Sequence, residues 1–79
     1  MEQLTILFGS IREIEQFVRI TTRLQGAVRV SSGEQVMDGK AIMGLMSLGL
    51  HRKLTMVYEG TREEFLTFRD SIQSYLAAG

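Results

Sequence analysis

The sequence contains no cysteine, no proline and no tryptophan, and it has no excess of charge of either sign. Without cysteine the chain cannot form a disulfide scaffold, bind zinc through thiolates or attack a substrate with a thiol. Nine basic residues balance nine acidic ones. This balance removes the general electrostatic argument for binding nucleic acid or an anionic membrane, and neither is expected as a partner. A basic patch would arise only if the fold gathered arginines onto one face.

Long apolar runs are also missing. The apolar stretches are far shorter than the roughly 20 residues that cross a bilayer. The N-terminus lacks the basic region and apolar run of a signal peptide. The sequence therefore predicts a cytoplasmic protein, and 79 residues form a single domain, residues 1–79. With one histidine and no cysteine, neither a metal ion nor a cofactor is expected.

What is present is an alternation of strand-like and helix-like segments punctuated by eight glycines. Short β-rich segments predict strands at 4–8, 27–31, 35–37 and 54–59. Apolar residues spaced three and four apart predict amphipathic helices at 10–25 and 40–48 and a last helix that carries Phe65, Phe68, Ile72 and Leu76 on one stripe. We expect Gly26 to end the first helix in the left-handed conformation.

Both long helices begin with the pattern of a capping box, in which a hydroxyl and an acid three residues later bond to each other's backbone amides. The first is Ser10–Glu13 and the second is Thr61–Glu64. The element order is therefore β-α-β-β-α-β-α. The simplest packing is an α+β fold with a four-stranded antiparallel sheet, three helices on one face and the other face open to solvent.

Residues 36–50, VMDGKAIMGLMSLGL, closely resemble the second-helix region of HPr, the histidine-containing phosphocarrier of the bacterial phosphotransferase system. That family typically reads along the lines of DGKSIMGLMSLG there. Weaker agreement in the order of helices, hairpin and glycines extends over nearly the whole chain. The resemblance implies the HPr-like open-faced β-sandwich, which agrees with the fold predicted from the pattern.

The chain departs from this family at both of its phosphorylation positions. HPr carries phosphate on a histidine between the first strand and the first helix. An alignment without gaps from the middle motif places Ser10 at that histidine and Arg12 at the arginine that steadies the phosphohistidine; an alignment on the first strand suggests a shortened loop instead. The serine that HPr kinase phosphorylates is Ala41 here.

The apolar patch that HPr proteins present to their partners is matched by Ile42, Met43 and Met46. The resemblance implies a non-phosphorylatable binding or regulatory homologue rather than an enzyme, and this surface, with Arg12 and Lys40 beside it, is the expected docking site. The expected partners are phosphotransferase-system components or a transcriptional regulator, in the regulation of bacterial sugar transport. Packing alone is an equal explanation of the methionines.

Two other functions remain open. A divergent phosphocarrier could use Ser10 or the single histidine, His51, although capping explains Ser10 and a surface turn explains His51. A self-associating structural domain could form dimers by strand addition at a sheet edge. The oligomeric state is accordingly expected to be a monomer or a weak dimer.

Overall fold

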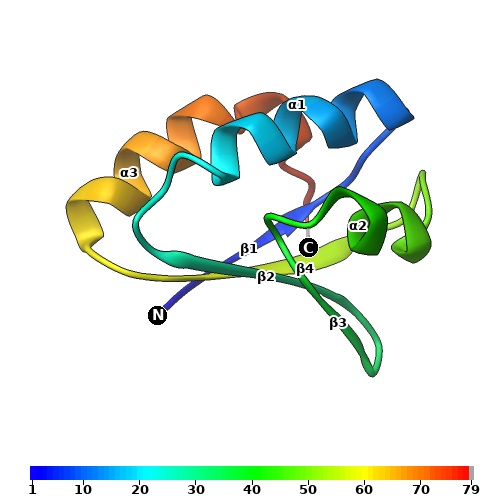
Figure 1. The fold of residues 1–79 in the computed structure, drawn as a ribbon, viewed down its shortest axis with the longest axis horizontal. Coiled ribbons are helices and arrows are strands. Elements are labelled where there is room, and N and C mark those ends of the chain that lie inside the picture. The colour runs from blue at the N-terminus through cyan, green and yellow to red at the C-terminus, as the bar shows by residue number, and fades with distance from the viewer. Residues whose placement is uncertain (79) are drawn as a thin grey trace.

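The computed structural model describes residues 1–78 of the chain. All seven predicted elements are present, and one short 3-10 helix follows the last of them (Figure 1). In order they are β1 (Glu2–Ile6), α1 (Ile11–Thr21), β2 (Ala27–Ser32), β3 (Gln35–Asp38), α2 (Ile42–Leu48), β4 (Leu54–Glu59), α3 (Arg62–Ser71) and η1 (Gln73–Tyr75).

The four strands form one antiparallel sheet in the order β1-β4-β2-β3. Its register places Met56 of β4 opposite Leu4 on one side and Val30 on the other. Since residues opposite each other point to the same face, these side chains share the inner face. The predicted alternation of β2 is confirmed, because Val28 and Val30 are buried while Arg29 between them is exposed.

The helices lie on one face of the sheet (Figure 1). The buried side chains of the core lie between the two layers. Aromatic rings from separate segments meet there, such as Phe8 from the connection before α1 and Phe17 from α1, whose ring centroids are 5.1 Å apart in an edge-to-face arrangement. The buried core consists of Ile6, Phe8, Ile14, Phe17, Val28, Val30, Leu45, Leu48, Leu54, Met56, Tyr58, Phe65, Phe68, Ile72 and Tyr75. The predicted α+β class and layer arrangement are confirmed.

The capping boxes form only in part. Ser10 Oγ accepts a hydrogen bond from the Glu13 N–H at 3.2 Å, as predicted, but the Glu13 carboxylate accepts from the Gly9 N–H rather than from Ser10. Thr61 Oγ1 likewise accepts from the Glu64 N–H at 3.1 Å. The Glu64 carboxylate instead binds groups distant in sequence. Local pattern therefore predicted the hydroxyl half of each box correctly.

The last helix is shorter than its apolar stripe suggested. α3 ends at Ser71, so Phe65, Phe68 and Ile72 are buried along it or at its end, but Leu76 is not helical. Leu76 lies in an extended segment that bridges Ile6 of β1. The prediction for Leu76 was wrong because pairing with the sheet edge replaces a further helical turn.

The role predicted for Gly26 was also wrong. α1 ends at Thr21, and the left-handed glycines are Gly33 and Gly49. Gly26 is required for a different reason, since a Cβ there would lie 2.5 Å from Cε1 of Tyr58. A glycine at this position allows the connection from α1 to pass directly over the Tyr58 ring.

Within residues 1–78 no helix combines the length and the apolar character needed to cross a membrane.

Candidate docking surface at the second helix

The second helix is held against the sheet by its apolar side and by one glycine. Leu45 and Leu48 are buried, and a Cβ on Gly44 would lie 3.3 Å from the Met37 side chain. α2 therefore lies directly on β3. Gly49 follows with φ 94°, a conformation that ends the helix and favours glycine.

The three predicted apolar docking residues differ in exposure. Ile42 and Met46 are half-buried and pack against the core, whereas 75% of Met43 is exposed. The contiguous apolar surface that α2 offers to solvent is therefore centred on Met43, with the outer parts of Ile42 and Met46 beside it. Packing explains most of the other two side chains.

The residues before α2 are fixed by polar contacts. The Lys40 N–H donates to Asp38 Oδ1, and its Nζ donates to the Leu24 carbonyl, both at 2.9 Å. Ala41 occupies the N-cap position of α2, is exposed and supplies no side-chain cap. Lys40 thus links α2 to the connection after α1.

Ser10 and Arg12 lie at the start of α1. Ser10 is the N-cap residue, half-buried, with its hydroxyl engaged by Glu13 as described above. Arg12 is exposed in the first turn and lines a shallow surface groove of about 410 Å³ with Glu15, Gln16 and Arg19. The start of α1 lies at the same end of the molecule as α2 (Figure 1).

His51 is brought to this end by tertiary structure. Its N–H donates to the Phe8 carbonyl at 2.8 Å, which joins the loop after α2 to the segment before α1. Its φ of 60° is left-handed, an uncommon conformation for a histidine. Forty-three positions separate the two partners, and no local pattern in the sequence signals the contact.

Arginines do gather on one side of α1. Arg12 and Arg19 are exposed, and their spacing of seven residues places them on one helical face. Arg23 is also exposed but lies beyond the end of α1 and lines another groove, which it shares with Glu64. Within residues 1–78 the two ion pairs lie elsewhere, between Arg29 and Glu59 and between Arg62 and Glu2. Of the acids, Glu15 shares the groove with Arg12 and Arg19.

Metal chemistry has no support from the described part of the chain. Among residues 1–78 no three His, Cys, Asp or Glu side chains are grouped so that they could hold an ion. What this end of the molecule offers is the exposed Met43 on α2, the exposed Arg12 in the first turn of α1 and one histidine, His51.

Comparison with solved structures identifies the architecture as the HPr fold. HPr-C-His from Thermoanaerobacter tengcongensis superposes with a TM-score of 0.75 at 24% identity, over 91% of this chain and 90% of that one. Phosphocarrier protein HPr from Bacillus anthracis superposes with a TM-score of 0.73 at 22% identity, over 96% of each chain.

A third similar structure is Crh, the catabolite repression protein of Bacillus subtilis, described as a swapped dimer. It has a TM-score of 0.66 and 22% identity, over 92% of this chain and 88% of that one. No family model and no curated protein matches the sequence. At these identities the likeness shows the shared fold.

Proposed function

We propose that this protein is a non-phosphorylatable, HPr-like binding or regulatory protein that docks a protein partner through the surface centred on Met43. The observation that carries the proposal is the 75% exposure of Met43 on a helix whose Leu45 and Leu48 are buried. A flexible, polarizable methionine on the surface adapts to a partner, and leaving it in water has no benefit for the monomer.

The surroundings of Met43 suit a partner with acidic groups. Ile42 and Met46 extend the apolar centre, while Lys40 and Arg12 supply positive charge at its margin. Apolar centres with charged rims are typical of protein interfaces, where the charges steer association. The proposed partners are components of a bacterial phosphotransferase system or a transcriptional regulator of sugar uptake, and the proposed compartment is the cytoplasm.

The proposed loss of phosphorylation rests on the two altered positions. The Ser10 hydroxyl caps α1 by accepting the Glu13 N–H, and the Glu13 carboxylate accepts the Gly9 N–H, so both groups have a structural role. The Ala41 methyl group cannot accept a phosphoryl group at all. These residues favour a role in binding rather than in phosphoryl transfer.

Binding to Enzyme I of a phosphotransferase system tests the docking surface. An isotope-labelled sample titrated with Enzyme I should show amide shifts concentrated in α2, and Met43→Asp should weaken binding about tenfold, because a carboxylate would be buried at the apolar centre. Leu66→Asp is the matched control, since Leu66 is a 37% exposed apolar residue on α3. Equal affinity of Met43→Asp and the unmodified protein would overturn the proposed surface.

A second candidate function has one specific observation in its favour. The hydrogen bond between His51 and Phe8 places the only histidine of the chain beside the segment in which HPr proteins carry theirs. As a divergent carrier, the neutral His51 ring would accept a phosphoryl group on one nitrogen while the nitrogen–phosphorus bond of a donor phosphohistidine breaks. The donor imidazole would leave with the electron pair of that bond.

Intact mass after incubation with phosphoenolpyruvate and Enzyme I separates the two functions. No added phosphoryl group, with ordinary HPr labelled in the same tube, is the expected result. A phosphorylated species that disappears in His51→Asn or Ser10→Ala would establish a carrier and overturn the non-phosphorylatable assignment. Asparagine is chosen for position 51 because it tolerates the left-handed backbone there.

A further inference from the structure

The two edges of the sheet differ in what covers them. At the β1 edge the chain's own C-terminal segment adds main-chain hydrogen bonds, from the Leu7 N–H to the Tyr75 carbonyl at 2.8 Å and from the Ala77 N–H to the Thr5 carbonyl at 2.9 Å. At the opposite edge, β3 pairs with β2 alone. Within residues 1–78 the open edge of the sheet is therefore β3.

The register of the β2–β3 hairpin determines which groups this edge presents. Ser32 and Gln35 close a two-residue turn and form a hydrogen-bonded pair, so Gln35 and Met37 direct their backbone groups toward β2. Val36 and Asp38 consequently direct theirs outward, although the Asp38 carbonyl already accepts one hydrogen bond, from the Ala41 N–H at 3.1 Å, and offers only its second lone pair. The Val36 side chain is also 57% exposed, so the edge combines unpaired main-chain groups with apolar surface.

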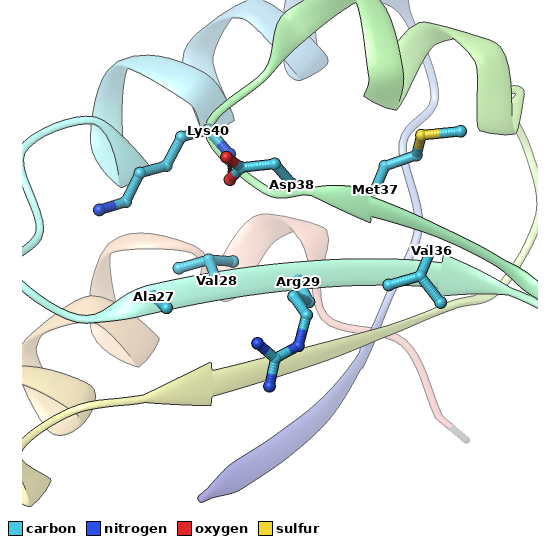
Figure 2. Close-up of a pocket in the computed structure, with 7 residues that line it drawn as sticks. All are labelled: Ala27, Val28, Arg29, Val36, Met37, Asp38 and Lys40. Carbon is cyan, nitrogen blue, oxygen red and sulfur yellow. Dashed lines mark hydrogen bonds between the residues drawn. The ribbon is translucent and has the colours of Figure 1, made fainter.

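A notch lies at the point where β3 leaves the sheet. β2 begins at Ala27, but β3 ends at Asp38 opposite Arg29, and beyond that pair the chain turns into α2. The resulting hollow of about 390 Å³ is lined by Arg29, Asp38 and Lys40 among others (Figure 2). Arg29 is paired with Glu59, and the Lys40 Nζ donates to the Leu24 carbonyl. Within residues 1–78 Lys40 is therefore the cation of this notch that forms no ion pair.

We propose that β3 pairs antiparallel with β3 of a second copy of this chain and forms a sheet that continues across a two-fold axis. With Met37 opposite its own counterpart, the outward-directed Val36 and Asp38 of the two copies hydrogen-bond to each other. In this register Glu34, at the tip of the hairpin, reaches Lys40 and the notch of the other copy. Both Glu34–Lys40 pairs form at once, as two-fold symmetry requires.

Charge favours this register over its neighbour. Centring the pair on Val36 would place Glu34 opposite Asp38 of the second copy, and like charges directly opposite each other are destabilising. β3 is thus preceded by an acid, Glu34, and followed by a cation, Lys40, so two antiparallel copies of the strand bring opposite charges together. Since only four residues pair, the contact is small and the dimer weak.

Sedimentation velocity from micromolar to millimolar concentration at low salt tests the dimer. The weight-average mass should rise with concentration, and hydrogen exchange at the Val36 and Asp38 amides should slow in parallel. Glu34→Lys and Lys40→Glu should each weaken association about tenfold, whereas the double exchange of both residues should restore it. Glu63→Lys, the same change of charge at an exposed position in the first turn of α3, should leave association unchanged.

A chain that remains monomeric over the whole range would overturn the proposal. Association insensitive to Glu34→Lys, or equally weak in the double exchange, would overturn it as well, because both results remove the Glu34–Lys40 pairing. Far-ultraviolet circular dichroism of each variant shows that the fold is retained. Lys40 belongs to the proposed docking surface as well, whereas Glu34 does not, so Glu34→Lys is the variant that tests the dimer alone. Sedimentation is measured without Enzyme I, so failure of the dimer is distinguishable from failure of the docking surface.

Discussion

At the residue scale, one carboxylate joins three parts of the chain. Glu64 Oε1 accepts from the Tyr58 hydroxyl at 2.6 Å and from the Gly26 N–H at 2.9 Å, and Oε2 accepts from the Gln25 N–H at 2.9 Å. The start of α3 is thereby fixed to β4 and to the connection between α1 and β2. Charge-assisted bonds of this kind are stronger than neutral ones.

The same contacts shift two pKa values in opposite directions. Hydrogen bonds, first from Tyr58 and then from the two backbone amides, lower the pKa of Glu64 from its ordinary 4.5. Burial, followed by the bond to Glu64, raises the pKa of Tyr58 above 10.0. The folded state thus favours an ionised Glu64 and a neutral Tyr58.

Glu64→Gln should therefore lower the free energy of unfolding at neutral pH. It should also make that free energy change less as the pH is lowered into the acid range. A lowered folded-state pKa means that the Glu64 contribution is complete above the ordinary pKa and is lost as pH falls through the folded-state value. We expect the variant to lose about 1–2 kcal/mol at pH 7 and to converge with the unmodified protein in acid. Urea unfolding at a series of pH values measures both effects. A constant difference across the acid range would contradict this role for the carboxylate, and Glu63→Gln is the control.

At the element scale, α1 depends on its cap because it carries so many polar residues. The Ser10 hydroxyl satisfies one of the free amides of the first turn, and the Glu13 carboxylate satisfies the Gly9 amide before it. The buried residues of the helix, Ile14, Phe17 and Thr21, fix the helix to the core. Thr21 also donates to the Gly39 carbonyl at 2.7 Å and so joins α1 to the connection between β3 and α2.

Ser10→Ala should cost about 1 kcal/mol of stability through the lost cap. Ser10→Asp should retain most of the stability, because a carboxylate both caps the helix and interacts favourably with its positive end. Thermal unfolding of the three proteins gives the comparison. An alanine variant as stable as the unmodified protein would show that the hydroxyl is not needed as a cap, and it would reopen a functional role for Ser10.

At the scale of the whole molecule, the C-terminal segment completes the fold by covering β1. The bridge between Ile6 and Leu76 and the bond from Ala77 to Thr5 extend the sheet by a short irregular strand. Tyr75, just before this segment, is buried and donates from its hydroxyl to Gln16 at 2.9 Å. The last described residues thus contact β1 and α1 together.

Ala77→Pro should uncover the β1 edge of the sheet. The substitution removes the N–H that bonds to Thr5 and should lower stability by about 1 kcal/mol, with more aggregation on heating because an edge strand is exposed. Ala78→Pro, one residue further on, is the matched control. Calorimetry with light scattering follows both quantities, and identical behaviour of the two variants would contradict a protective role for this segment.

Local chemistry in the sequence determined the elements. Alternating valines specified β2, spacing of apolar residues specified the helices, and Ser10 and Thr61 were recognisable as caps because each acts within three residues of itself. The resemblance at residues 36–50 identified α2 as the candidate docking helix. These features depend on neighbours along the chain, so the order of residues suffices to predict them.

Tertiary structure alone decided the rest, because it depends on contacts between distant residues. The exposure of Met43 beside half-buried Ile42 and Met46 follows from how α2 lies on β3, and the position of His51 follows from its bond to Phe8. Gly26 is needed because Tyr58 approaches it from β4. Each of these facts requires two segments to meet in space, and no periodicity within either segment encodes that meeting.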